Sequence, residues 1–255
     1  MKRVILCLLC SVCLLSVVPA QATFVADNNG NLYNYDITTG SSSLIGNSGV
    51  GAWYDIALNP TNGSLYGITG YGYFYSIDPS TGTPTYIGKA ESFINGLTFD
   101  SSGTLYGSGG QYLYTLDLAS GSATQVGSTG FNSSGDLAFD ADGNLYLTAS
   151  ASGGSNGDQL VAVDASTGAS RKIGDIGYRF VYGLSFVDST LYGFTSGQDI
   201  LNINMGSGLG TGIGTTDIAA YGATGGNAAP VPEPATMLLF GSGLAGLACY
   251  RNKKK

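Results

Sequence analysis

Residues 96 to 127 read G-L-T-F-D-S-S-G-T-L-Y-G-S-G-G-Q-Y-L-Y-T-L-D-L-A-S-G-S-A-T-Q-V-G and show the repeat unit of this chain most clearly. Its apolar and aromatic residues come in four short bursts separated by Gly, Asp and Ser. Bursts of this length between turn residues indicate β-strands, and no helical period runs through them. Four short strands in about 40 residues are typical of one blade of a β-propeller.

The same phrases recur along the chain and give the number of blades. Leu-Tyr pairs stand at 65/66, 105/106, 145/146 and 191/192. The phrase that opens each unit, such as D-I-A-L or G-L-T-F, starts five times, at Asp55, Gly96, Asp136, Gly183 and Asp217. An Ile-Gly or Val-Gly phrase also occurs five times, at Ile45, Ile87, Val126, Ile173 and Ile213. We therefore predict an all-β fold, a five-bladed β-propeller of four-stranded blades over residues 23–225.

The two ends of the repeat region complete each other. T-F-V-A at 23–26 aligns with the second strand of a blade, and D-I-A-A at 217–220 aligns with a first strand. The last strand is therefore expected to complete the first blade, which removes exposed sheet edges. The pattern resembles NHL-type propeller repeats, in which G-L-A-F-D-x-x-G-N-L-Y is a common phrase, and this resemblance implies a fold rather than an activity. The alternative, a β-solenoid, does not need a first strand from the far end.

The C-terminal segment combines three elements in a fixed order. Residues Val231, Pro232, Glu233 and Pro234 follow a linker that starts at 226, an apolar run occupies 235–250, and one arginine and three lysines end the chain. Sixteen helical residues span roughly 24 Å, slightly less than the ~30 Å hydrocarbon core of a bilayer. This order resembles the PEP-CTERM sorting tag of Gram-negative bacteria, which implies a transmembrane sorting helix at 235–255 and processing by an exosortase-type enzyme at the inner membrane. A plain C-terminal membrane anchor is the alternative.

The N-terminal segment predicts export as well. Lys2 and Arg3 precede an apolar stretch at 4–18, and Ala20 and Ala22 supply the small residues that a signal peptidase needs, so we predict a signal peptide over 1–22. Three cysteines lie inside this segment and the fourth is Cys249 in the C-terminal apolar run. The exported domain therefore contains no disulfide and no cysteine nucleophile.

Charge and composition exclude several classes of function. Residues 23–230 contain four basic and sixteen acidic residues, a formal charge of −12. A nucleic-acid partner is excluded because phosphate binding needs a basic surface. The chain has no histidine, which excludes imidazole-based triads and the usual zinc sites.

Aromatic residues gather in the variable loops of one predicted face. These loops join the second strand to the third and each blade to the next, and the other face carries short, repeated polar turns. Aromatic rings on exposed loops can stack on the apolar faces of sugars. The alternative is that they pack between blades. The candidate ligand-binding residues are Trp53, Tyr54, Phe93, Phe131, Tyr178, Phe180 and Tyr182.

Three aspartates are the candidates for chemistry. Asp55, Asp136 and Asp217 each open a predicted innermost strand, so they are expected to ring one mouth of the central channel. Three carboxylates there could bind Ca²⁺, or could serve as acid, base and pKa modulator in glycoside cleavage. A structural role at the start of a strand is the alternative.

These observations favour an exported, non-enzymatic binding or structural protein of the cell surface or extracellular matrix. Its expected partners are the exosortase-type enzyme, the inner membrane during sorting, and exopolysaccharide or envelope glycan. A secreted glycoside hydrolase or lyase that uses the axial aspartates is the second hypothesis. A protein-binding surface component is the third.

Overall fold

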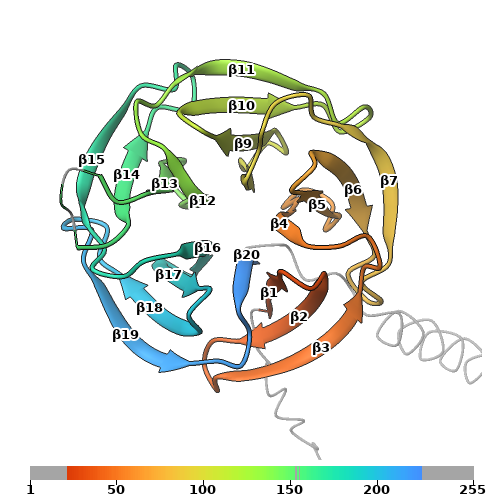
Figure 1. The fold of residues 1–255 in the computed structure, drawn as a ribbon, viewed down its shortest axis with the longest axis horizontal. Coiled ribbons are helices and arrows are strands. Elements are labelled where there is room, and N and C mark those ends of the chain that lie inside the picture. The colour runs from red at the N-terminus through yellow and green to blue at the C-terminus, as the bar shows by residue number, and fades with distance from the viewer. Residues whose placement is uncertain (1–21, 153, 155, 226–255) are drawn as a thin grey trace, which may run out of the picture.

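The computed structural model describes residues 22–225, except 153 and 155. These residues form five antiparallel sheets of four strands each, arranged around a central axis (Figure 1). The predicted five-bladed propeller is confirmed.

The strands follow the repeated phrases closely. From the innermost to the outermost strand, the five sheets contain: blade 1, β20(Ala220–Gly225), β1(Ala22–Asp27), β2(Asn31–Asp36), β3(Ser41–Asn47); blade 2, β4(Trp53–Leu58), β5(Leu65–Thr69), β6(Tyr73–Ile77), β7(Pro84–Lys89); blade 3, β8(Gly96–Phe99), β9(Leu105–Gly109), β10(Tyr112–Leu116), β11(Ala123–Ser128); blade 4, β12(Ser133–Phe139), β13(Leu145–Ala149), β14(Gln159–Val163), β15(Ser170–Asp175); blade 5, β16(Val181–Val187), β17(Thr190–Thr195), β18(Asp199–Ile203), β19(Gly210–Thr215).

Blade 1 is built from both ends of the described chain. Strand β20 pairs antiparallel with β1, with Thr23 opposite Gly225 and Val25 opposite Ala223. Strand β20 is the innermost strand of its blade and lies beside β4 and β16 of the neighbouring blades (Figure 1). The ring is therefore closed by hydrogen bonds between distant parts of the chain.

The hydrophobic core is divided into five clusters, one between each pair of neighbouring blades. Between blades 1 and 2, for example, Ala26 and Leu32 pack against Trp53, Ile56 and Leu65. The inner strands are almost wholly buried, whereas the outermost strands alternate between half-buried and exposed residues. Blade-to-blade packing therefore supplies the apolar burial that stabilises the ring.

The polar turns between strands are held by aspartate side chains. Asp78 accepts hydrogen bonds at Oδ1 from the Ser80 amide (2.8 Å) and the Ser80 hydroxyl (2.6 Å), and Gly82 closes that turn with a φ of 72°. Asp140 accepts from the amide of Asn144 (2.8 Å) and from its side chain (2.8 Å). These turns join the first strand to the second and the third strand to the fourth in the blades. We call their side of the disc the turn face, and we call the opposite side the loop face.

The Ile-Gly and Val-Gly phrases mark a bulge in each outermost strand. In β11, Gly127 pairs with Leu113 and Gln125 pairs with Tyr114, so that Val126 is the extra residue. The same register shift occurs in β3, β7, β15 and β19. The bulge brings the glycine against a turn of the next blade. A side chain on Gly127 would collide with the backbone of Thr167, next to Gly168.

This glycine contact is present at four of the five seams between blades. Gly46 lies against Gly82, Gly88 against Gly121, Gly127 against Gly168, and Gly174 against Gly208. At the seam between blades 5 and 1, a side chain on Gly214 would meet nothing within 4 Å. The adjacent Ile213 is 51% exposed, whereas its four counterparts are half-buried. The outer part of this seam is therefore more open than the others.

The difference between the seams predicts opposite responses to the same substitution. Gly127→Ala should destabilise the domain by about 1–3 kcal/mol, because the added methyl group overlaps the neighbouring turn. Gly214→Ala should change the free energy of unfolding by no more than about 0.5 kcal/mol, because the site is open. Urea unfolding of the two variants measures both values. Equal destabilisation by both would contradict this account of the seams.

Candidate functional site

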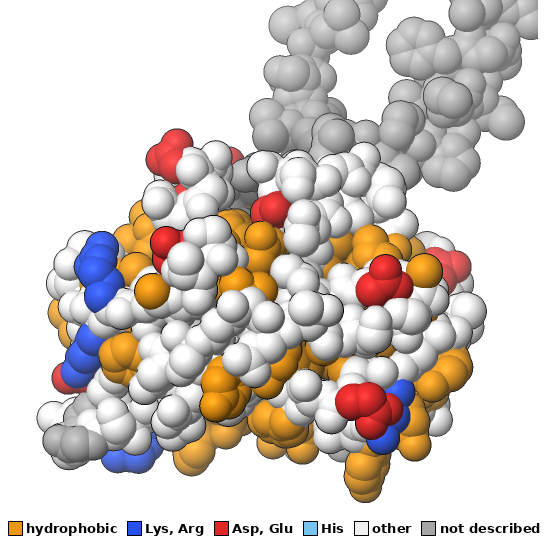
Figure 2. Space-filling model, turned by 90° about the horizontal axis from the view of Figure 1, so that it is seen from above, with side chains coloured by type: hydrophobic (Ala, Val, Ile, Leu, Met, Phe, Trp, Pro, Cys, Tyr) orange, Lys and Arg blue, Asp and Glu red, His pale blue; other side chains and the backbone are white. Residues whose placement is uncertain are grey.

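The innermost strands place one residue of each blade at the loop-face end of the central channel. The five positions are occupied by Tyr54, Asn95, Gly135, Tyr182 and Tyr221, each directly before the residue that approaches the axis. Together with Phe93 and Ser134 they line a hollow of about 250 Å³, which we call the mouth. Figure 2 shows the disc from its edge, with hydrophobic side chains protruding from its lower side and few Lys or Arg side chains.

The aromatic rings of the mouth support one another by edge contacts. The centroids of Tyr182 and Tyr221 lie 5.1 Å apart at an interplanar angle of 61°, and Tyr54 meets Phe93 at 6.1 Å and 81°. Gly135 leaves room for this arrangement, since a Cβ there would lie 2.7 Å from Cα of Tyr182. The rings are therefore held in place before any ligand arrives, which lowers the entropy cost of binding.

Polar groups lie among the rings. The side-chain Oδ1 of Asn95 is buried and has no hydrogen-bond partner, while Nδ2 makes only a long contact of 3.5 Å to the Ser133 carbonyl. The Ser134 hydroxyl donates to Asp158 at 2.7 Å. A buried amide oxygen without a partner costs free energy. The Asn95 side chain thus adds a neutral polar group to the lining of the mouth, although its Oδ1 has almost no exposed surface of its own.

Asp158 positions one wall of the mouth. Its Oδ2 accepts from the Val181 amide at 2.9 Å, and the Phe180 amide also donates to this carboxyl. Burial raises the pKa of Asp158, and the hydrogen bond from Ser134 acts in the opposite direction. Phe180 has a φ of 58°, which is uncommon for a bulky residue, and its ring is 54% exposed beside Tyr182. The structure thus holds an exposed aromatic ring at the rim at some conformational cost.

The structure separates the predicted aromatic residues into two groups. Tyr54, Phe93 and Tyr182 line the mouth and Phe180 lies next to them. Trp53 is fully buried, with its ring 5.7 Å from that of Tyr75, and Phe131 and Tyr178 are half-buried against core clusters. Packing therefore accounts for Trp53, Phe131 and Tyr178.

The mouth also contains residues that the sequence did not reveal. Asn95 and Ser134 are not aromatic, so the aromatic pattern of the loops did not point to them. Tyr221 was missed because residues 217–220 were aligned with the first strand of a blade. The strand begins at Ala220 instead, and its sequence Y-G-A-T at 221–224 matches Y-G-L-S at 182–185. The shared Tyr-Gly pair was the signal that could have found it.

Asp55 and Asp136 lie at the axis beneath the mouth. The five positions that approach the axis, Asp55, Gly96, Asp136, Gly183 and Gly222, form what we call the hub. Both carboxyl groups have no exposed surface, and each accepts hydrogen bonds from backbone amides and contacts the other. Burial, reinforced by Asp136, raises the pKa of Asp55 well above its usual range, and burial likewise raises the pKa of Asp136. A substrate in the mouth does not reach these sealed groups.

The predicted ring of three carboxylates is wrong. Asp217 is exposed in the connection before β20, where its Oδ1 accepts from the Ser42 hydroxyl at 3.3 Å. Gly222 takes the third place in the hub instead. Within the described part of the chain, no group of three Asp, Glu, Cys or His residues could hold a metal ion. The geometry therefore removes the basis for Ca²⁺ binding by these three aspartates.

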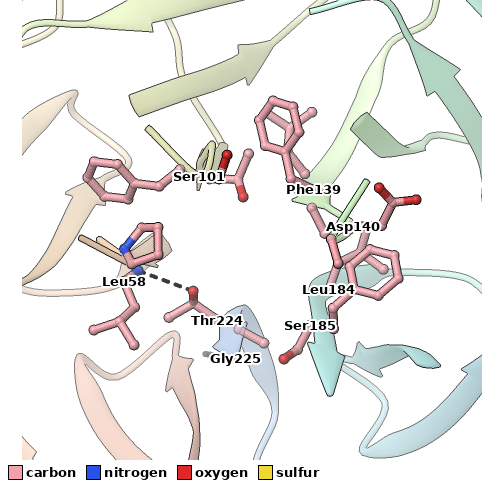
Figure 3. A pocket seen from close by; sticks show the side chains of 16 residues that line it. Leu58, Ser101, Phe139, Asp140, Leu184, Ser185, Thr224 and Gly225 are labelled. Atoms are coloured by element: carbon pink, nitrogen blue, oxygen red, sulfur yellow. Dashed lines mark hydrogen bonds between the residues drawn. The ribbon is translucent and has the colours of Figure 1, made fainter. Parts of the chain in front are cut away.

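A second hollow of about 130 Å³ lies at the turn-face end of the channel (Figure 3). Residues of all five innermost strands line it, among them Phe139, Leu184 and Ser185, and the Thr224 hydroxyl accepts a hydrogen bond from the Leu58 amide at 3.1 Å. The hub separates this hollow from the mouth.

Comparison with known proteins identifies the C-terminal segment. Residues 230–254 match the PEP-CTERM protein-sorting motif. This motif implies export and sorting through an exosortase-type enzyme, and it includes the predicted Val231, Pro232, Glu233 and Pro234. The segment and the predicted signal peptide lie outside the described residues, apart from Ala22, which begins β1. Within 22–225, no helix is long and apolar enough to cross a membrane.

Similarity to solved structures concerns the fold. A chain in the crystal structure of a nidogen/laminin complex superimposes with a TM-score of 0.53 at 14% sequence identity, covering 81% of this chain and 86% of that one. At this identity the likeness shows the propeller architecture alone. A search of curated protein sequences finds no match.

Burial predicts how two of the aromatic candidates will differ. Trp53→Ala should destabilise the domain by about 3–5 kcal/mol, because it empties a fully buried site. Phe93→Ala should change stability by no more than about 0.5 kcal/mol, because the ring is largely exposed. Thermal and urea unfolding measure the difference. A large loss with Phe93→Ala would mean that this ring is part of the packing.

Proposed function

We propose that the propeller is the binding module of an exported, exosortase-sorted protein and that its mouth binds an uncharged polysaccharide. The observation that carries this proposal is the grouping of four aromatic rings with the neutral polar side chains of Asn95 and Ser134 around one hollow; the rings are those of Tyr54, Phe93, Tyr182 and Tyr221. Aromatic faces stack on the C–H surfaces of sugar rings, and amide or hydroxyl groups among them bind sugar hydroxyls. Protein-bound sugars need this mixture of flat apolar and neutral polar surface.

Charge favours a neutral sugar. The seven residues that line the mouth include no Lys, Arg, Asp or Glu. The whole exported region carries a formal charge of −12. A polyanionic polymer would be repelled by this field and would find no cation in the mouth.

The positions of the two ends of the described chain support access to the mouth from the side away from the membrane. Residues 22 and 225 lie at the turn-face ends of the paired strands β1 and β20, whereas Tyr221 lies near the opposite end of β20. The sorting motif begins five residues after Gly225. While the motif is at the membrane, the mouth therefore faces away from the point of attachment.

The buried acid groups favour binding without cleavage. A retaining or inverting glycosidase needs carboxyl groups that touch the glycosidic oxygen and the sugar. Asp55 and Asp136 are fully buried and engaged by backbone amides. The polymer should therefore keep its length when it is bound.

Alanine substitutions at the mouth test the proposal. Tyr182→Ala and Phe93→Ala should each weaken retention of the producing organism's exopolysaccharide roughly three- to tenfold, because each removes a stacking surface of about 0.5–1.5 kcal/mol. Affinity electrophoresis measures retention, and size-exclusion chromatography measures polymer length.

The matched control is Tyr71→Ala, which removes a tyrosine that is 81% exposed and lies outside the mouth. It should leave retention unchanged, and Phe93→Ala should leave the thermal midpoint unchanged. Equal loss with Tyr71→Ala would place binding elsewhere. Shortened polymer would show hydrolysis, and no retention by the unaltered protein would turn the search to a protein partner.

A further inference from the structure

The innermost strand of every blade has one edge without a neighbouring strand, and that edge faces the axis. Its backbone N–H groups must find other partners, because unpaired buried amides are costly. In each blade the residue after the hub position directs its N–H toward the hub. These residues are Ile56, Leu97, Leu137, Leu184 and Ala223.

Two carboxyl groups accept all five of these hydrogen bonds. Asp55 accepts from Ile56 at 2.7 Å and from Leu97 of the next blade at 2.5 Å. Asp136 accepts from Leu137 at 2.6 Å, from Leu184 of the next blade at 2.5 Å, and from Ala223 of the closing strand β20. All five blades are thus connected through this pair, which we call the acid pair.

The remaining hub positions are glycines because the acid pair and the neighbouring strands fill the space. A Cβ on Gly222 would collide with the Asp55 carboxyl group, and one on Gly183 would lie 2.8 Å from Cβ of Ala223. The hub therefore has room for two carboxyl groups and no more.

The two carboxyl groups interact with each other in the sealed hub, and a hydrogen bond between two carboxyl groups needs one proton. Two ionised carboxylates have no proton to donate and would repel at close range without solvent. Asp136 receives three amide hydrogen bonds and Asp55 two, so Asp136 is better able to hold the negative charge and Asp55 the proton. Within the described part of the chain, the main influences on the pKa of each aspartate are burial, backbone amides and the other aspartate.

The closing seam is where the ring has least additional support. At blades 5 and 1 the outer glycine contact is missing, and the long, exposed hydrogen bond between Ser42 and Asp217 takes its place. Strand β20 pairs with β1 on one side, and its other edge depends on Asp136.

We propose that the acid pair shares a single proton that holds the propeller closed, and that loss of this proton opens the ring at the seam between blades 5 and 1. Two negative charges in the sealed hub would force the carboxyl groups apart. The Ala223 amide would then lose its acceptor, and β20 would separate from β16, where blade 5 meets blade 1.

The direction of the pH dependence follows from the sign of the shift. Because the pKa of Asp55 is higher in the folded than in the unfolded state, the folded state binds the extra proton. The stabilisation by this proton is complete below the unfolded-state pKa of about 3.9, and it is lost as pH rises toward the folded-state pKa. Between these two pKa values, release of this proton should raise the unfolding constant about tenfold per pH unit. The turn residues Asp78 and Asp164, whose pKa values are lowered by turn hydrogen bonds, act in the opposite direction at acid pH.

The first test detects the proton directly in the full-length chain. Infrared spectroscopy of the protein carrying ¹³C-labelled aspartate should show a protonated carboxyl band at pH 6, where ordinary aspartates are about 99% ionised. Asp55→Asn should remove this band, and Asp158→Asn should leave it, although the pKa of Asp158 is also raised. Absence of the band from the unaltered protein would overturn the proposal even if Asp55→Asn does not fold.

The second test measures stability and local opening against pH. Asp55→Asn keeps a donor toward Asp136 that cannot ionise, so its unfolding constant should lose the tenfold rise per pH unit. Asp217→Asn, a matched change at the exposed seam, should keep that rise. Hydrogen exchange, corrected for the intrinsic effect of pH, should increase first in β19 and β20. An unchanged pH dependence of the unfolding constant in Asp55→Asn would contradict the proposal. So would an increase in hydrogen exchange that is shared equally by all blades.

Discussion

The propeller depends on how it satisfies the open edge of its innermost strands. A ring of sheets hides its inner edges from other chains, yet it leaves backbone amides around a channel too narrow for a further strand. Here Asp55 and Asp136 accept the hydrogen bonds of five such amides, one from each blade. Hydrophobic clusters between blades supply most of the burial. The acid pair determines that the five sheets meet at one point.

The two faces of the disc differ in how regular their connections are. On the turn face, short turns are repeated because each needs the same aspartate and glycine geometry, as at Asp78 and Gly82. On the loop face the connections differ between blades, and they place unlike side chains around the mouth. A repeated architecture thereby presents an asymmetric site in which three tyrosines, one amide and one glycine occupy equivalent positions. The hub keeps this site separate from the hollow on the turn face.

Much of the fold could be predicted because the repeat phrases have direct structural causes. The Asp-to-Gly turns, the Ile-Gly bulges and the Leu-Tyr strands each recur with their own geometry, so counting them gives the number of blades. The site was harder to predict. Trp53 and Tyr54 are neighbours in sequence, but alternation along β4 buries the first and directs the second to the mouth. Asp217 begins the sequence D-I-A-A, which resembles D-I-A-L at 55–58, although β20 begins three residues later. The Tyr-Gly pair at 221–222, which matches the pair at 182–183, marks the correct register, but an alignment on the aspartate obscures it.

Closure by the last strand also links folding to sorting. The residues of β20 lie immediately before the PEP-CTERM motif at 230–254, yet in space they form the centre of the ring. Blade 1 is incomplete until this strand pairs with β1, and the hub is incomplete until the Ala223 amide reaches Asp136. The domain can therefore close only when nearly all of the chain before the motif is available to fold. Because residues 22 and 225 end together on the turn face, the mouth lies on the face opposite to the point where the described chain ends.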